Sequence, residues 1–537
     1  MKAVNDFIDL TQLAPRAPIA WCGRAAASYG VGDFASSLAA AKYARDLAPH
    51  DPRPYFVLAP PAYALADRTF ISLCANFVGA LDPQSGRNMA SFWSQRLAEK
   101  NFFGEAADAF GLFALKHPNE IGIGFQYVDL LLNAFRLEEA EKILMRISAL
   151  GATPAGVDAL FARIHVARGD IKAASDSAAR AITADPDCIV AYAVLADVEP
   201  GRVDGAGAAR LERLISSDAC PIDKRIVGGV ALGRVFEKEG DIDSAFAAFT
   251  NANKLSAQSL AAAGMRYDRS AGEADVRREI ARYPSPPDAA ETEDASPRLL
   301  FIIGMPRSGS TLVDQILSRH SAVASVGESM IVPQFVDRIS HRAKASGGSS
   351  RDFPIGLREE FMSAYAKAGA AGLVVDKNLF NFQHCGLIAD LDPGARFILV
   401  LRDPGDVALS IFRMKFLATH PWSNDLDDIA HTIACFELLT DHWRRLFADR
   451  MRVLQYETLV KDFEGNVRAL LDFCGLGFEP ECLEFHEGER AVFTQSATQV
   501  RRPLSAEGIG RWRRYERHLE GFWRSLDDFR RRLRVDA

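Results

Sequence analysis

A recurring spacing of 34 residues in the first half of the chain constrains its fold more than any other feature. Phe103, Leu137, Ile171 and Gly205 lie 34 residues apart. Three positions after each of them comes an alanine: Ala106, Ala140, Ala174 and Ala208. Two outlying units deviate slightly from this spacing: Phe34 lies 69 residues before Phe103, and Ile242 lies 37 residues after Gly205, with Ala245 at the same offset. Prolines follow three of the markers by 15 residues: Pro49, Pro118 and Pro186.

This spacing predicts a stack of helix pairs. A small residue lets neighbouring helices approach closely, and proline ends a helix because it has no backbone N–H. Each pair buries its apolar face only against the next pair, so several repeats are needed. The pattern resembles the tetratricopeptide repeat (TPR) family over about residues 20–255, which implies an all-α TPR-like solenoid. A generic Ala-rich helical bundle is the alternative.

The texture of the sequence changes near residue 298. Residues 256–283 keep a helical pattern, and the following segment, "YPSPPDAAETEDASPR", contains four prolines and four acidic residues. After it, short β-branched runs alternate with helical stretches, which is typical of α/β proteins. We therefore predict helical repeats over 20–255, a helical connector and linker over 256–297, and an α/β domain over 298–537.

Composition limits the class of protein. A chain of 537 residues exceeds the size of a single core, and its net charge of -7 argues against nucleic-acid binding by the chain as a whole. No apolar run has the length of a membrane span, and the start lacks the apolar core of a signal peptide. Eight scattered cysteines suit reduced, mostly buried thiols. We expect a cytoplasmic protein with no metal, no nucleic-acid partner and no membrane span; the oligomeric state stays open.

Four apolar runs in the second half are candidate strands, and each leads directly into polar or Gly-rich residues. They cover residues 299–303, 372–375, 396–401 and 452–455. The carboxyl ends of parallel strands meet at one edge of a sheet, where α/β proteins bind their ligands. The sequence therefore predicts a binding crevice at this edge.

The segment "GMPRSGST" after the first run has the outline of a phosphate-binding P-loop. Gly304, Gly309 and Thr311 take the expected positions, but Ser310 replaces the lysine. Backbone amides and the start of the next helix form an anion cradle, and an arginine adds a fixed charge. Without the lysine, the usual clamp on β- and γ-phosphates is missing, so a smaller anion is favoured. The candidate ligands are Pro306, Arg307, Ser308, Gly309, Ser310 and Thr311.

A second polar segment, "RDPGDVALS", follows the third run. Asp403 and Pro404 predict a helix N-cap and first turn. Arg402 and Ser410 are then candidates to hold another phosphate group. The alternative for Arg402 is an ion pair with Asp403 or Asp406.

Together, "GMPRSGST" and "LRDPGDVALS" resemble the 5′-phosphosulfate loop and the 3′-phosphate motif of sulfotransferases that use 3′-phosphoadenosine 5′-phosphosulfate (PAPS). Within that group, residues 297–520 resemble the tyrosylprotein sulfotransferase-like branch and its TPR-fused bacterial relatives. The resemblance implies a P-loop-type parallel-sheet sulfotransferase domain, with PAPS as co-substrate and no metal. A donor without a β,γ-phosphate chain fits the missing lysine.

The same resemblance implies roles for single residues. Glu328 is the implied general base, with a helix cap as the alternative. Lys377 and Arg307 are implied to neutralise charge in the transition state. Tyr456 matches a tyrosine near the nucleotide, although packing at a strand end explains it nearly as well. The C-terminal segment adds Ser496 near the reacting group, and Arg501, Arg502 and Arg511 near the 3′-phosphate or ribose.

These expectations describe transfer of a sulfuryl group from PAPS to an acceptor hydroxyl. A TPR platform beside such a domain favours a protein or peptide tyrosine as acceptor; a saccharide, a lipid or a small phenol are alternatives. Two other classes stay open. One is a P-loop kinase-like enzyme, and the other is a TPR scaffold with an inactive second domain.

Overall fold

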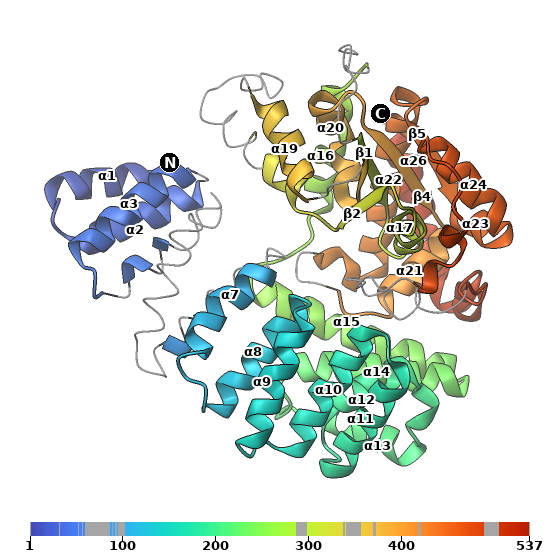
Figure 1. The fold of residues 1–537 in the computed structure, drawn as a ribbon, viewed down its shortest axis with the longest axis horizontal. Helices are drawn as coiled ribbons and strands as arrows, with labels where there is room; N and C mark the ends of the chain where they lie inside the picture. The colour runs from blue at the N-terminus through green and yellow to red at the C-terminus, as the bar shows by residue number, and fades with distance from the viewer. Residues whose placement is uncertain are drawn as a thin grey trace. The chain divides into compact units, whose positions relative to one another are not determined.

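A computed structural model describes most of the chain, and its fold consists of two compact units, Met1–Ile164 and His165–Ala537 (Figure 1). The described residues are 2–31, 33–51, 53–55, 57, 58, 86–88, 90, 91, 94, 103–285, 298–336, 339, 356–368, 372–416, 420–487 and 504–535. Ser496, Arg501 and Arg502 lie outside these residues, so their predicted roles stay predictions.

The first unit is helical throughout its described part. Asp33 caps the helix that starts at Phe34 by accepting a hydrogen bond from the Ser36 amide at 3.0 Å. Ala106 and Ala140, the small residues of two repeat units, are fully buried. The helices are α1 (Lys2–Leu13), α2 (Pro18–Gly30), α3 (Phe34–Leu47), α7 (Phe103–Ala114), α8 (Ile121–Asn133), α9 (Leu137–Ala149) and α10 (Pro154–Arg168), the last of which runs past the boundary of the unit.

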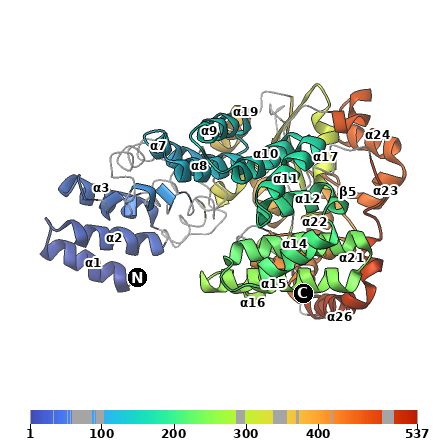
Figure 2. The same ribbon diagram turned by 90° about the horizontal axis from the view of Figure 1, so that it is seen from below.

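The second unit begins with further helices: α11 (Ile171–Ala184), α12 (Ile189–Val198), the 3₁₀ turn η1 (Pro200–Arg202), α13 (Gly205–Ser216), α14 (Ile222–Glu239), α15 (Ile242–Ala262) and α16 (Arg269–Arg282). Helices α12, α14 and α15 lie side by side (Figure 2). Each repeat marker is the first residue of a helix. Arg136 before Leu137 makes no side-chain cap, but before the three markers of this unit an aspartate caps the free amides. Asp170, Asp204 and Asp241 fill this role. The helix pairs are thus observed, whereas a TPR-type superhelix stays a prediction.

A five-stranded parallel sheet of order β2-β3-β1-β4-β5 forms the centre of the second unit (Figure 1). Its strands are β1 (Arg298–Gly304), β2 (Val323–Gly327), β3 (Leu373–Asp376), β4 (Arg396–Leu401) and β5 (Met451–Gln455). The four predicted strands are confirmed to within one residue at each end. The fifth, β2, was missed because "VASVG" is a half-buried stretch with Ala, Ser and Gly, and so lacks a continuous apolar run.

Alternation along the central strands builds two cores, since successive strand residues point to opposite faces. Phe301 and Phe397 pack into one core with α22 and α26, and Ile302 and Ile398 pack into the other with α17 and α24. The helices around the sheet are α17 (Ser310–Ser318), α19 (Leu357–Ala368), α20 (Cys385–Leu391), α21 (Pro404–Phe412), α22 (Leu426–Leu446), α23 (Tyr456–Lys461), α24 (Phe463–Phe473) and α26 (Glu516–Val535). Short 3₁₀ turns are η2 (Leu379–His384), η3 (Pro421–Asn424), η4 (Pro480–Leu483), η5 (Phe485–Glu487) and η6 (Arg511–Tyr515).

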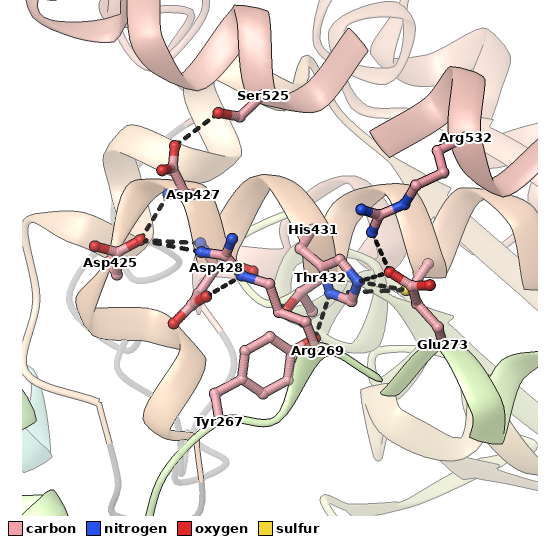
Figure 3. Close-up of polar contacts among 11 residues, drawn as sticks. Tyr267, Arg269, Glu273, Asp425, Asp427, Asp428, His431, Thr432, Ser525 and Arg532 are labelled. Carbon is pink, nitrogen blue, oxygen red and sulfur yellow. Dashed lines mark hydrogen bonds and ion pairs between the residues drawn. The ribbon is translucent and has the colours of Figure 1, made fainter. Parts of the chain in front are cut away.

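Helices α15 and α16 are bonded directly to the sheet region. The Asn253 side-chain amide of α15 donates to the Phe412 carbonyl oxygen at 2.7 Å. Figure 3 shows the second link, in which the buried His431 ring of α22 contacts the Tyr267 hydroxyl at 2.8 Å and Glu273 Oε1 of α16 at 3.0 Å. Buried polar groups that are satisfied in this way hold elements in one arrangement. The sheet and these helices therefore form one packed body.

Two of the predicted boundaries fall on ordered structure. Residue 255 lies inside helix α15. Tyr283, the first residue of the predicted linker, is fully buried, and its hydroxyl donates to Asp390 Oδ2 at 2.8 Å. Residues 286–297 of that linker lie outside the described residues. The division into domains at 255 and 297 stays a prediction. None of the helices in the described part of the chain has the length and apolarity that crossing a bilayer requires.

Candidate active site

Five strands end at the same edge of the sheet, and a predicted site residue follows each end. Glu328 comes directly after β2, Lys377 after β3, Arg402 after β4 and Tyr456 after β5. The loop of Arg307 follows β1, the central strand. All strands are parallel, so these side chains start from one edge, as the sequence predicts.

The loop after β1 is tight, and two of its residues have left-handed backbone conformations. Arg307 has φ 70° and Gly309 has φ 101°. A Cβ on Gly309 would lie 2.3 Å from the Tyr456 ring, so only glycine fits there. Ser310 and Thr311 are buried at the start of α17. The Ser308 side chain is 1% exposed, and its Oγ has no hydrogen-bond partner among the described residues. A buried hydroxyl of this kind suits a polar ligand. Pro306 is buried in the same loop.

Arg307 and Arg402 are held by neutral oxygen atoms of the chain. Arg307 Nε donates to Ser410 Oγ on α21 at 2.9 Å. Arg402 Nη1 donates to the Arg307 carbonyl oxygen at 3.0 Å, and Nη2 donates to the Gly508 carbonyl oxygen. The Nε of Arg402 is buried without a partner in the described residues. The neutral acceptors of Arg402 do not cancel its positive charge, which suits an anionic ligand.

The start of α21 is built as its sequence predicts. Asp403 caps the helix by accepting from the amides of Gly405 at 2.8 Å and Asp406 at 3.2 Å. Asp406 in turn accepts from the amides of Gly510 at 2.6 Å and Trp512 at 3.1 Å. Both carboxylates accept from backbone amides, and Arg402 donates to carbonyl oxygens. The alternative prediction, an ion pair of Arg402 with Asp403 or Asp406, is therefore not what these hydrogen bonds show. Asp406 also ties the C-terminal segment to the edge of the sheet.

Glu328 and Lys377 form an ion pair at the ends of β2 and β3. Lys377 Nζ lies 2.5 Å from Glu328 Oε1. The lysine is 2% exposed, whereas the Glu328 side chain is 52% exposed. A buried ammonium group needs an anionic partner, and Glu328 provides it. The sheet order places Lys377 beside the loop of β1 and leaves Glu328 reachable from solvent.

Asp376, the last residue of β3, organises this pair. It is buried and accepts hydrogen bonds from the hydroxyls of Ser329 and Tyr365, the latter at 2.6 Å, and from the Asn378 amide at 2.8 Å. Burial raises the pKa of Asp376 to about 6. The bond to Ser329 fixes the residue next to Glu328. Asp376 was not among the predicted site residues, although an acidic residue at the end of an apolar strand is a signal that the sequence contains.

The two remaining predicted residues lie in different surroundings. The Tyr456 ring lies under the Arg402 guanidinium, with 4.7 Å between Arg402 Cζ and the ring centroid. Tyr456 therefore packs at the end of its strand and also lies beside a predicted anion ligand. Arg511 Nη2 pairs with Glu237 Oε2 of α14 at 3.1 Å. The predicted contact of Arg511 with a 3′-phosphate or ribose stays a prediction.

A cavity of about 630 Å³ joins most of these groups. Its described lining includes Arg307, Gly309, Thr311, Arg402 and Ser410. This volume lies in the range of pockets that hold small molecules. These five candidate ligands thus face one common space, whereas Ser308, Ser310, Glu328 and Lys377 are not part of its described lining.

Comparisons with known proteins agree with this geometry. Residues 297–480 match the model of a sulfotransferase family. An uncharacterized protein of Aquifex aeolicus (strain VF5) is 30% identical over 445 residues, which are 79% of this chain and 53% of that protein. The protein-tyrosine sulfotransferase of Drosophila melanogaster is 26% identical over 235 residues, which are 40% of this chain and 46% of that protein.

The chain spans about half the length of these curated relatives. Among solved structures, the sulfotransferase domain from the Synechococcus PCC 7002 olefin synthase is 19% identical, with a TM-score of 0.29, over 42% of this chain and 90% of that one. Residues 297–480, which contain the parallel sheet, thus match a sulfotransferase family and are similar to protein-tyrosine sulfotransferases, and a mostly helical region precedes them.

Proposed function

We propose that the chain transfers a sulfuryl group from PAPS to an acceptor hydroxyl. The observation that carries this proposal is the set of anion-binding groups at one sheet edge, built on a P-loop without its lysine. Arg307, Ser308, Arg402 and Ser410 suit the phosphate and sulfate groups of such a donor, and the family match names the class of reaction.

In the proposed step, Glu328 takes the proton of the acceptor hydroxyl. The acceptor oxygen forms a bond to sulfur, while the bond between sulfur and the leaving phosphate oxygen breaks. Protonation removes the negative charge of Glu328, so Lys377 becomes available to the charge that grows on the leaving oxygen. Arg307 and Ser496 complete this charge stabilisation, and Arg402 and Ser410 hold the 3′-phosphate. Positioning and electrostatics supply most of the rate gain.

A protein or peptide tyrosine is the proposed acceptor. Two observations support it: the similarity to relatives named protein-tyrosine sulfotransferases, and the solvent exposure of the Glu328 side chain. The helical repeats, as a TPR-like solenoid, would present such a peptide. Mass spectrometry of sulfated products from a panel of peptide, saccharide, lipid and phenol acceptors tests this choice. Carbohydrate products alone would contradict a protein acceptor.

Calorimetric titration with adenosine 3′,5′-bisphosphate, beside Mg-ATP, tests the donor. We expect tight binding of the bisphosphate and weak binding of ATP, because the loop lacks the lysine that clamps β- and γ-phosphates. The reverse preference would indicate a kinase-like enzyme, and binding of neither would indicate an inactive scaffold.

A further inference from the structure

Helix α14 presents a charged face to the donor cavity. Arg234, Glu237 and Lys238 occupy positions i, i+3 and i+4, so they lie on one side of the helix. All three line the cavity that also contains Arg307 and Ser410. This helix precedes residues 297–480, which match the sulfotransferase family, so the family match assigns it no role.

Glu237 fixes this face against the sulfotransferase domain. Its side chain is 4% exposed, and it forms ion pairs with Arg413, next to α21, and with Arg511 of η6. Arg514 Nη2 also donates to the Glu237 carbonyl oxygen at 3.3 Å. A buried carboxylate between two guanidinium groups is costly to break. The position of α14 relative to the loop is therefore well defined.

Arg234 lies next to the arginines of the anion site. Its Nη1 pairs with Asp197 Oδ1 of α12 at 2.6 Å, and its side chain is 20% exposed. Burial, together with the nearby charges of Arg402, Arg413 and Arg234, lowers the pKa of Arg307 to about 10. Arg307 keeps its charge at neutral pH, so several positive charges face the same space.

The described lining of the cavity has more positive than negative side chains. The seven basic residues are Arg234, Lys238, Arg307, Arg402, Arg413, Arg511 and Arg514, and the four acidic residues are Asp197, Glu237, Asp406 and Glu507. An enclosed excess of positive charge attracts an anion with more than one charge. Asp406 is already used by two backbone amides, and Glu237 is used by two arginines.

We propose that Arg234 binds an anionic group of the donor, so that helix α14 completes the donor site. This inference rests on the proposed function and adds a binding residue from outside the matched domain. Asp197 holds the guanidinium beside the cavity, and the donor anion competes with this carboxylate for it. Arginine suits this exchange, because its planar group can bind two oxygen acceptors at once.

Titration of full-length variants with adenosine 3′,5′-bisphosphate tests the proposal. Arg234→Ala should weaken binding roughly 10- to 100-fold, the effect of losing one hydrogen bond to a charged group. Arg225→Ala is the matched control, since Arg225 lies on the same helix but outside the described cavity lining, paired with Asp218. It should bind like the wild type. Wild-type affinity in Arg234→Ala would overturn the proposal.

The variant Asp197→Asn distinguishes two roles of Arg234: a ligand of the donor, or a partner in an ion pair that only holds the fold. If Arg234 binds the donor, removal of its competing carboxylate leaves affinity equal or higher. If the pair only holds α12 to α14, both variants should weaken binding by similar factors, which would overturn the proposal. Melting temperatures show whether each variant folds. If Arg234→Ala does not fold, Arg234→Lys takes its place; this variant keeps the charge and should retain part of the affinity.

A failure of the proposed function is distinguishable from a failure of this inference. Wild-type protein that does not bind the bisphosphate contradicts PAPS as donor. The same variants are then titrated with inorganic pyrophosphate, which probes the anion site alone. Weaker pyrophosphate binding by Arg234→Ala would still support its role as an anion ligand, and unchanged binding would overturn it.

Discussion

The two sides of the candidate site differ in how their charges are balanced. On the proposed acceptor side, Lys377 and Glu328 neutralise each other across adjacent strand ends. On the proposed donor side, Arg402 donates to two carbonyl oxygens, which do not cancel its positive charge, and Arg307 donates to the Ser410 hydroxyl. One side is thus closed by an internal ion pair, and the other is prepared for an anion. This difference suits a site where the donor binds as an anion and the acceptor arrives as a neutral hydroxyl.

The acceptor side is the first place to test this comparison. Glu328→Ala should lower turnover by about 10²- to 10⁴-fold, the usual contribution of a general base, because no other group is proposed to take the proton. Donor affinity should change little. Steady-state kinetics and bisphosphate titration measure the two effects separately. Glu464→Gln, an exposed glutamate of α24, is the control. Equal losses of turnover and donor affinity would contradict the assignment of a base.

The donor side should show the opposite behaviour. Arg402→Ala should weaken bisphosphate binding by roughly 2–5 kcal/mol, because it removes a partly buried charge that the anion needs. Arg468→Ala, on the exposed surface of α24, is the matched control. Calorimetry provides the affinity of each variant. An Arg402→Ala protein with wild-type affinity would remove Arg402 from the donor site.

Asp376, which is bonded to the residue next to Glu328, makes the stability of the fold depend on pH. Its pKa is about 6 in the folded protein against an ordinary value of 3.8, and burial is the main cause. The folded state therefore holds the proton more tightly, so this group stabilises the fold below pH 3.8 and loses that contribution as pH rises through 6. The change is about 3 kcal/mol. Urea unfolding of wild type and Asp376→Asn at pH 4, 5.5 and 7 measures it.

The stability of the wild type relative to Asp376→Asn should fall from pH 4 to pH 7. Parallel pH curves for the two proteins would show that Asp376 has an ordinary pKa. Kinetics of the same variant report on Glu328, because Ser329, the next residue in the chain, donates a hydrogen bond to Asp376. A loss of turnover in Asp376→Asn with unchanged donor affinity would confine its role to the acceptor side.

Much of this site could be predicted from local patterns. Arg402 and Lys377 follow apolar strands directly, and Asp403 and Pro404 show where a helix begins. Strand β2 was missed because its side chains are half-buried and small. The position of α14 could not be predicted, since Arg234 lines the same cavity as the loop only through packing between segments far apart in the sequence. Local patterns carry no information about such contacts.

The smallest expected effect concerns the bond between the two phosphate motifs. Ser410→Ala removes the acceptor of Arg307 Nε, a hydrogen bond of 2.9 Å, while leaving both arginines in place. We expect bisphosphate affinity to fall by about 1–2 kcal/mol, since one hydrogen bond involving a charged group is lost. Ser505→Ala is the control, because Ser505 lines the same cavity without a predicted role.

Ser410 also separates two ways in which the donor side can work. If Ser410 only positions Arg307, then Ser410→Ala and Arg307→Ala should not be additive, because the first change acts through the second residue. If Ser410 itself binds the donor, the two losses of affinity should add. Calorimetry of both single variants and the double variant measures this coupling. Additive losses would identify Ser410 as a donor ligand in its own right, and non-additive losses would make it a positioning residue for Arg307.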